Sequence, residues 1–479
     1  MIRKAIAICF VSLWMAIDLF AQIPDTTGQK LTLQECIQIA LKNNADILHT
    51  QITSGIDKTS WQGSKGYMMP TLNGDINHGI NTGRNIDPFT NTYANQTIRF
   101  ANYSLNTSLT LFNAFAIQNN IKQNKLAFQA SEFEVQNQKD VIALNVILQY
   151  LQILTNEDLL SASEQQQVVS QKQVDRLNIL NDEGSISPSE FYDLKGEYAN
   201  NQLTVVNAQD NLETAKILLS QLLNIPYNKN QDLQRLGLSD FSENTMQNTD
   251  SIYRAALQNL AVIKAAELRN RSALYGVKTY RSQRYPSLYF NGGLYTNYSS
   301  NATTQQYINS TDVTTNSYVI NGSDKLPVIA PQDNYSISKI NYGNQFKNNY
   351  NTAFSIGISI PLLNNFRNKT QIKTAVLQQK DAEITLNSAK TQLQQNVEQA
   401  YVNVTSAKSR YDVLAEQVNA YGESFREAEI KFNAGSINSV EYLIAKNNLD
   451  QSNLNLIIAK YDYVLRSMVL DYYSGRLTF

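Results

Sequence analysis

The feature that most constrains the fold of this chain is an internal duplication. Before each of two similar prolines the matches share an offset of 216 residues: Ala40-Leu41 with Ala256-Leu257, and Pro70 with Pro286. Farther along, the offset is 251 residues: Gly184-Ser185-Ile186-Ser187 with Gly435-Ser436-Ile437-Asn438. A duplication of this length predicts two copies of one supersecondary unit that pack side by side.

The second copy carries about 35 additional residues, the difference between the two offsets. They lie between positions 299 and 350 and are rich in Asn, Ser, Thr and Tyr. This composition predicts a long solvated loop.

After each proline the apolar residues recur at every second position. In the first copy Leu72, Ile76 and Ile80 alternate with polar residues, and the second copy repeats the pattern from Phe354 to Ile360. Runs of about ten residues have the length that a tilted strand needs to cross a bilayer. A soluble sheet with one buried face shows the same alternation, so both readings stay open at this point.

The segments between these hairpins predict long helices. Neither proline nor glycine occurs from about Ala114 to Asp182, and roughly 70 helical residues make a rod of about 105 Å. Apolar residues from Val397 to Val418 follow a heptad, which is typical of coiled coils. Gly184 and Gly435 suit the left-handed position that ends a helix, and Pro188 suits the start of the returning helix.

The first residues, 1–21, read as a signal peptide. Arg3 and Lys4 precede an apolar stretch that is too short for a membrane anchor, and Ala21 is a plausible cleavage point. Cleavage would leave one cysteine, Cys36, and therefore no internal disulfide. Since no later stretch has eighteen consecutive apolar residues, a membrane-embedded form would have to use its strands.

Four strands cannot close a barrel, and open strand edges are not tolerated in lipid. Two chains would supply eight strands and a barrel filled by its own side chains, whereas three chains would supply twelve strands and leave room for a pore. The predicted fold class is therefore a mixed α and β membrane protein of two tandem repeats. Each repeat has a transmembrane β-hairpin and a coiled-coil helical hairpin, and a trimer closes one barrel.

The predicted division of the chain follows the duplication. It has a signal peptide (1–21), repeat 1 (22–225), an equatorial linker (226–250) and repeat 2 (251–479). In repeat 1 the β-hairpin covers about 67–112 and the helical hairpin about 113–225. In repeat 2 the β-hairpin covers about 285–362, with an external loop of about 299–350, and the helical hairpin covers about 363–468.

Few residues suggest chemistry. The only two histidines, His49 and His78, are far apart, and His78 lies in the first strand, where we expect a pore or rim residue. No phosphate-binding loop or nucleophile elbow is present. The 40 basic and 41 acidic residues give no charge excess that would attract nucleic acid. We therefore expect no enzyme, no catalytic residue, no cofactor and no metal site.

The order of elements resembles that of the TolC-like outer-membrane efflux protein family. The resemblance rests on Leu31-Thr32-Leu33-Gln34-Glu35-Cys36, on Ala40-Leu41-Lys42-Asn43-Asn44, on the two Gly-Ser-Ile turns and on the prolines that open the strands. It implies a homotrimer in the outer membrane with a twelve-stranded barrel and a periplasmic tunnel of helices. Such a protein is a passive conduit for efflux or type I secretion. It docks a periplasmic adaptor at its helical tips and works indirectly with an inner-membrane pump.

The resemblance also implies site residues at the tips. The docking motif of the family is a Gly-Leu-Ser triplet, and it matches Gly184, Ile186 and Ser187 in one turn and Gly435, Ile437 and Asn438 in the other. An isoleucine in such a turn also suits the turn's own packing.

Acidic residues ring the closed tip in well-known members of the family. The corresponding positions here suggest Glu190, Asp193 and Glu441 as an ion gate. The simpler interpretation is that acidic residues stabilise helix N-termini.

Two other classes of protein fit the pattern. A trimeric outer-membrane adhesin or stalk would have a barrel anchor and a coiled-coil body but would not conduct. A soluble coiled-coil scaffold would explain the helices but not the hairpins between them.

Overall fold

The structure is a computed structural model that describes residues 30–86, 91–95, 97–236, 248–477 and 479. It contains two compact units. The first, the helical unit, comprises residues up to 53, 132–265 and 387–479, and the second, the strand unit, comprises 54–131 and 266–386. The predicted signal peptide lies outside the described residues. None of the described helices is both long and apolar enough to cross a bilayer.

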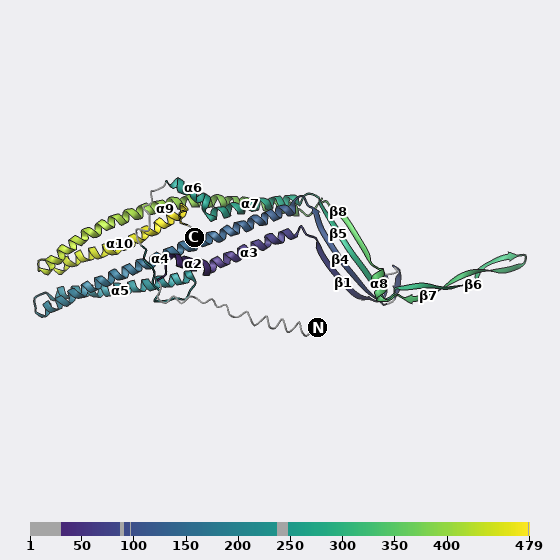
Figure 1. Ribbon diagram of the computed structural model, residues 1–479, viewed down its shortest axis with the longest axis horizontal. Coiled ribbons are helices and arrows are strands. Elements are labelled where there is room, and N and C mark those ends of the chain that lie inside the picture. Colours follow the sequence, from purple (N-terminus) through teal and green to yellow (C-terminus); the bar gives the residue numbers. More distant parts are fainter. Residues whose placement is uncertain (1–29, 87–90, 96, 237–247, 478) are drawn as a thin grey trace. The chain divides into compact units, whose positions relative to one another are not determined.

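Among the described residues, eight long or medium helices form two similar series. The first is α2 (Leu33–Asn43), α3 (Ala45–Gly66), α4 (Ala116–Asp182) and α5 (Pro188–Leu223). The second is α6 (Thr249–Asn259), α7 (Ala261–Ser282), α9 (Arg367–Asn433) and α10 (Ser439–Tyr473). Both α4 and α9 have 67 residues, so the run without proline or glycine does form one helix, as predicted. Figure 1 shows α5 folding back along α4 and α10 along α9. The second helical hairpin ends at Tyr473 and not at 468, because apolar residues of its last turn, among them Leu470, are buried.

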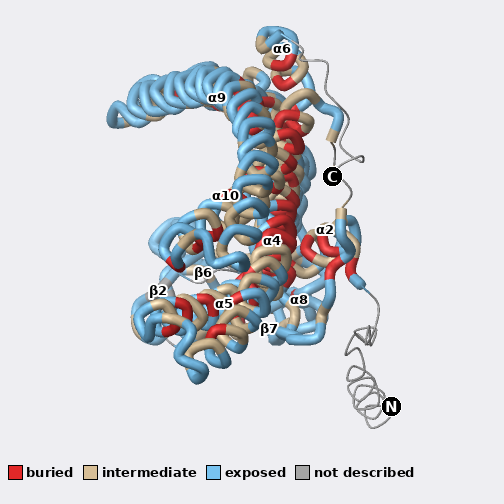
Figure 2. The backbone as a smooth tube through the Cα atoms, turned by 90° about the vertical axis from the view of Figure 1, so that its left-hand side faces the viewer, coloured by how far each residue is buried: buried red, intermediate tan, exposed pale blue. Residues whose placement is uncertain are grey.

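The core of the helical unit lies where short helices cover long ones. Figure 2 shows its buried residues concentrated along α4. Ile147, Tyr150 and Leu154 of α4 pack against α2, α5 and α10 in the larger cluster. The Tyr150 hydroxyl lies within hydrogen-bond distance of the backbone carbonyls of Leu31 (3.1 Å) and Gln234 (2.6 Å), so it ties the start of α2 to the linker.

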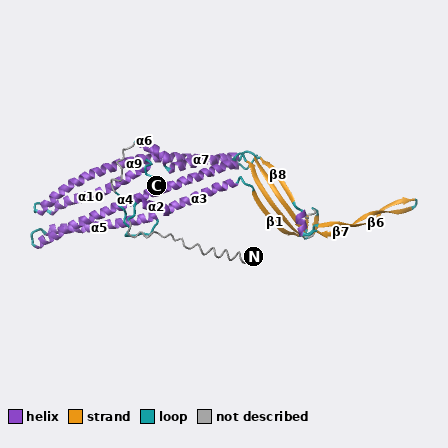
Figure 3. Ribbon diagram, viewed as in Figure 1, coloured by secondary structure: helices purple, strands orange, loops and turns teal. Residues whose placement is uncertain are grey.

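The strand unit contains a four-stranded antiparallel sheet in the order β1-β4-β5-β8. The strands are β1 (Thr71–Asn81), β4 (Ile98–Phe112), β5 (Ser287–Ser299) and β8 (Asn351–Ser359). They lie side by side in Figure 3. The two strands at the edges, β1 and β8, each have a hydrogen-bonded neighbour on one side only among the described strands.

The expected loop at 299–350 is regular for most of its length, so that expectation was wrong. It contains β6 (Thr303–Asn321), β7 (Asp324–Lys339) and the short helix α8 (Tyr342–Asn348). Gly322, with a φ of 66°, turns β6 into β7. The segment is rich in polar residues, but its Thr, Val, Ile and Tyr residues also favour strands. The segment that connects β1 to β4 in the sequence forms a separate two-stranded sheet of β2 (Arg84–Ile86) and β3 (Tyr93–Asn95).

Candidate channel-lining face and helical tips

The four-stranded sheet has one polar and one apolar face. Side chains alternate along each strand, and residues paired between antiparallel strands share a face. From the register, the polar face carries the following residues: Thr71, Asn73, Asp75, Asn77, Asn102, Ser104, Asn106, Ser108, Asn291, Tyr295, Asn297, Asn351 and Ser355.

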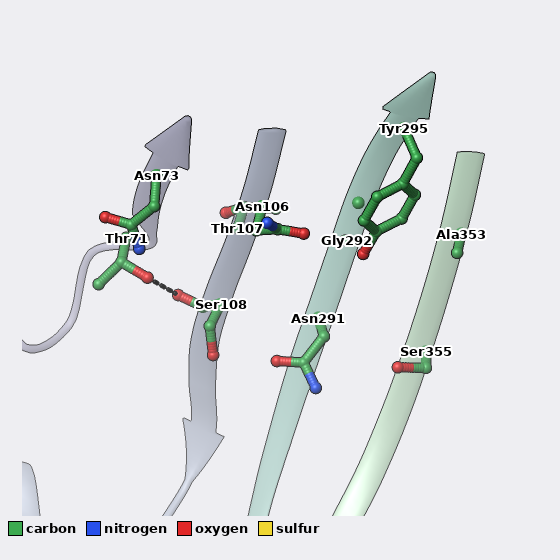
Figure 4. Close-up of a pocket in the computed structure, with 11 residues that line it drawn as sticks. Thr71, Asn73, Asn106, Thr107, Ser108, Asn291, Gly292, Tyr295, Ala353 and Ser355 are labelled. Carbon is green, nitrogen blue, oxygen red and sulfur yellow. Dashed lines mark hydrogen bonds between the residues drawn. The ribbon is translucent and has the colours of Figure 1, made fainter. Parts of the chain in front are cut away.

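Hydrogen-bonding side chains crowd the middle of this polar face. Figure 4 shows Asn73, Asn106, Asn291 and Ser355 on four successive strands around a shallow hollow. The Asp75 carboxylate accepts hydrogen bonds from Ser104 Oγ (3.2 Å) and Asn106 Nδ2 (3.4 Å). The polar half of the strand alternation already indicates these positions in the sequence.

The opposite face is apolar and largely uncovered. It carries Leu72, Ile76, His78, Ile80, Ala101, Tyr103, Leu105, Leu109, Phe290, Leu294, Tyr298, Phe354, Ile356 and Ile358, and among them the polar residues Arg99, Thr107, Thr296 and Thr352. Ile76 is 76% exposed and Phe354 72% exposed. A continuous apolar surface of this kind marks contact with a membrane or another protein. His78, for which we expect a pore or rim position, shares this face with Ile76 and Ile80.

The tip turns have the predicted backbone geometry. Gly184 and Gly435 have φ values of 65° and 69°, so the expected left-handed conformation is confirmed at both. Ser187 and Asn438 are the N-caps of the returning helices: Ser187 Oγ accepts a hydrogen bond from Ser189 N (3.3 Å), and Asn438 Oδ1 accepts one from Glu441 N (3.0 Å).

The two tip isoleucines lie on one apolar cluster. Ile186 and Ile437 are half-buried and pack against the buried residues Leu177, Phe191, Leu194 and Tyr442. The structure therefore brings the two turns together, and their isoleucines contribute to this packing. Burial also raises the pKa of the Tyr442 hydroxyl to about 12.

The candidate gate carboxylates occupy helix starts. Glu190 and Glu441 are each the third residue of their helix, and Asp193 is exposed one turn later. Within the described residues none of the three has a cation within 4 Å. This placement is the one in which the helix dipole stabilises an acidic side chain.

Polar contacts between the helical hairpins were not anticipated. Arg176 of α4 hydrogen-bonds to Asn433 of α9. Lys446 of α10, whose side chain is only 3% exposed, forms ion pairs with Asp450 and with Glu197 of α5 (3.8 Å). The spacing of Lys446 and Asp450 is a signal that sequence analysis missed, but nothing in the sequence pairs Arg176 with Asn433.

Among the residues that the structure describes, no group of His, Cys, Asp and Glu has the arrangement of a metal site.

Comparison with solved structures shows the same fold in several channels of the outer membrane. VceC of Vibrio cholerae superposes with a TM-score of 0.75 at 13% identity, covering 92% of this chain and 96% of that one. The Campylobacter jejuni CmeC outer membrane channel gives 0.74 at 15% identity, with 93% and 85% covered. The open state of the Neisseria gonorrhoeae MtrE outer membrane channel gives 0.71 at 17% identity, with 93% and 90% covered.

The comparison by sequence agrees with the comparison by fold. No curated protein sequence matches the chain. The profile of the outer membrane efflux protein family matches residues 36–224 and 252–476, which is most of the chain and covers both helical hairpins. The chain therefore belongs to the outer membrane efflux protein family, a family of channel proteins, and its location is the outer membrane.

Proposed function

We propose that the protein is the outer-membrane component of a tripartite efflux or type I secretion system and acts as a passive, non-catalytic conduit from the periplasm to the exterior. The observation that carries this proposal is the two-faced sheet. Its apolar face is exposed over lengths that suit a bilayer, while its polar face presents Asn and Ser side chains that suit water.

A pair of neighbouring residues provides the test of this assignment. Asn106 lies on the polar face and Leu105 on the apolar face of the same strand. In planar bilayers, a charged thiol reagent should reduce the conductance of Asn106→Cys and leave that of Leu105→Cys unchanged. Block of Leu105→Cys alone would contradict the lining assignment. The absence of any conductance would favour the adhesin or stalk.

The open edges of the sheet support a homotrimer. β1 and β8 each leave one row of backbone groups without a partner strand in this chain, and lipid does not tolerate such edges. Three copies would join β8 of one chain to β1 of the next in a twelve-stranded barrel. Mass measurement of the detergent-extracted protein should give three copies. A monomer or dimer that conducts would refute the closure of the barrel by three chains.

The helical tips are the proposed docking site for a periplasmic adaptor. Both turns present an isoleucine two residues after the left-handed glycine, and the two side chains lie on one cluster. Because Ile186 and Ile437 are half-buried, aspartate at both positions alters both packing and surface. The double variant should lose export and adaptor cross-linking while keeping the trimer. Retained export would show that the adaptor does not recognise these side chains.

The acidic residues at the helix starts are proposed to form the ion gate of the closed tip. In a trimer each carboxylate is repeated three times, and a ring of this kind favours cations at a constriction. Glu190→Gln, Asp193→Asn and Glu441→Gln combined should reduce the cation preference that reversal potentials measure across a salt gradient. An unchanged reversal potential would refute the ion gate, and the three carboxylates would then serve only to stabilise the helix N-termini.

A further inference from the structure

The short helix α8 lies on the apolar face of the sheet. The Phe346 ring contacts Tyr103 at 5.4 Å between centroids, and the Tyr342 ring contacts Tyr298 at 4.5 Å. Thr296 Oγ1 donates a hydrogen bond to the Phe346 carbonyl (2.8 Å). Tyr103, Thr296 and Tyr298 share the face of Ile76 and Leu105, so α8 covers one end of the surface that we assign to lipid.

A buried glutamine holds α8 in this place. Gln345 is 1% exposed, and its amide bridges the backbone of β5. Gln345 Oε1 accepts from Ser299 N (2.9 Å), and Gln345 Nε2 donates to the carbonyls of Ser299 (3.0 Å) and Ile340 (2.8 Å). The helix is therefore a fixed part of the sheet end and not a loose connection.

The outer side of α8 remains aromatic and uncovered. Tyr342 is 42% exposed and Phe346 46% exposed, although both rings also pack on the sheet. Tyr350, just after the helix, is exposed as well. Aromatic side chains with one apolar and one wetted side accumulate at the level of lipid headgroups.

Basic residues are exposed at the end of the sheet where α8 lies. Arg99, Lys339 and Lys347 are exposed near the helix. No carboxylate occurs in the sequence between Asp333 and Asp381, or between Asp75 and Glu132 apart from Asp87. Exposed cations suit a layer of anionic headgroups.

The position of α8 along the strands also agrees with the level of the lipid headgroups. α8 contacts Tyr103 of β4 and the last residues of β5, Thr296 to Ser299, at the end where β6 begins. A tilted strand of nine to eleven residues crosses the hydrocarbon core. β5 has 13 residues, so its end reaches the boundary between acyl chains and headgroups.

We propose that α8 is an interfacial lipid anchor, which places Tyr342 and Phe346 among the headgroups of the membrane leaflet at the β6–β7 end of the sheet, with Lys347 facing anionic headgroups. This inference rests on the proposed lipid contact of the apolar face. It assigns to α8 a partner, the lipid surface, and it fixes the depth of the sheet in the bilayer.

Tryptophan quenching by brominated lipids tests the depth of α8. With Trp61→Phe as background, Phe346→Trp is placed in vesicles whose phospholipids carry bromine either close to the headgroup or near the end of the acyl chain. Two further variants calibrate the signal: Ile356→Trp in the middle of the apolar face, and Ile320→Trp at the turn of the β6–β7 hairpin. We expect stronger quenching by the shallow bromine at Phe346→Trp, stronger quenching by the deep bromine at Ile356→Trp, and none at Ile320→Trp.

The outcomes separate this inference from the proposed function. If Ile356→Trp is quenched and Phe346→Trp is not, the anchor is refuted and the lipid-facing sheet stands. If Ile356→Trp is not quenched, the lipid-facing sheet itself is refuted. If Phe346→Trp disturbs folding, Tyr342→Trp gives the same readout. Adding anionic lipid should increase the shallow quenching, and Lys347→Gln should remove that increase; an identical response with Lys347→Gln would refute the role of Lys347.

Discussion

Arg176 of α4 donates two hydrogen bonds to Asn433, the last residue of α9, one to its side-chain Oδ1 and one to its backbone carbonyl (3.3 Å from Nη2). The two residues are far apart in sequence and belong to different helical hairpins. Carbonyls in the last turn of a helix have no partner within the helix, and a cation near them is favourable. The contact therefore both caps α9 and joins the hairpins close to their turns.

Arg176→Gln should loosen this junction. The loss of an exposed charged hydrogen bond costs about 1 kcal/mol locally, and hydrogen exchange of the amides from Phe432 to Ile437 should become faster. Lys172→Gln, a change of an exposed cation one turn away on α4, is the control and should leave the exchange unchanged. Equal exchange in the two variants would mean that the hairpins are held together by packing alone.

Asn438→Ala should weaken the start of α10. Asn438 Oδ1 accepts from Glu441 N at 3.0 Å, and removal of such a cap costs about 1 kcal/mol. The thermal midpoint should fall, while Asn438→Ser, which keeps a capping oxygen, should restore most of it. Ser436→Ala in the same turn is the control, since Ser436 is exposed and does not cap the helix. A loss of the same size with Ser436→Ala would show that the turn and not the cap is responsible.

Lys446→Met should destabilise the helical unit. It removes ion pairs to Asp450 and Glu197 from a side chain that is 3% exposed. Because both carboxylates keep some access to water, we expect a loss of about 2 kcal/mol, below the range for fully buried pairs. Lys195→Met changes the exposed lysine at the matching position of the first copy and should have little effect. Combining Lys446→Met with Asp450→Asn should recover part of the loss in thermal denaturation.

The Cys36 thiol should be unreactive in the folded protein. Burial raises its pKa from 9.0 to about 12, so the reactive thiolate is scarce at pH 8. The unfolded chain loses this proton at a lower pH than the folded chain. The stability that the buried thiol contributes is therefore present below pH 9 and is lost as pH rises toward about 12. Alkylation followed by peptide mass mapping should label Cys36 only in denaturant, and rapid labelling of the native protein would contradict its burial.

The β6–β7 hairpin should be dispensable for the sheet. Its strands pair with each other, and its base is closed by a hydrogen bond from Ile340 N to the Ala302 carbonyl (2.9 Å). Replacing residues 303–339 by a short Asn-Gly turn should preserve conductance, because loop closure depends weakly on length. Deleting α8 is the contrasting change and should lower stability, because α8 packs on β5. If the hairpin faces the exterior, as expected of the predicted external loop, protease added to intact cells should cleave within it.

Local sequence patterns predicted the helices and turns whose conformation depends on neighbouring residues. α4 follows from a long stretch without proline or glycine, and the left-handed glycines follow from their place after a helix. The packing at the helical tips could not be predicted from local patterns, because Ile186 shares a cluster with Tyr442, which is remote in sequence. The hairpin at 303–339 was missed because its many polar residues resemble those of a loop, while its strand character depends on pairing between β6 and β7.

By itself, the sequence determined the duplication, the long helices, the turns and the alternation that gives the sheet its polar and apolar faces, since each depends on neighbouring residues and on backbone preferences. Only the tertiary structure decided that Ile186 and Ile437 share one cluster, that Arg176 meets Asn433, and that α8 rests on Tyr103 and Tyr298. These contacts join residues that are distant in the chain. Their free energy arises from packing and register, which no local pattern specifies.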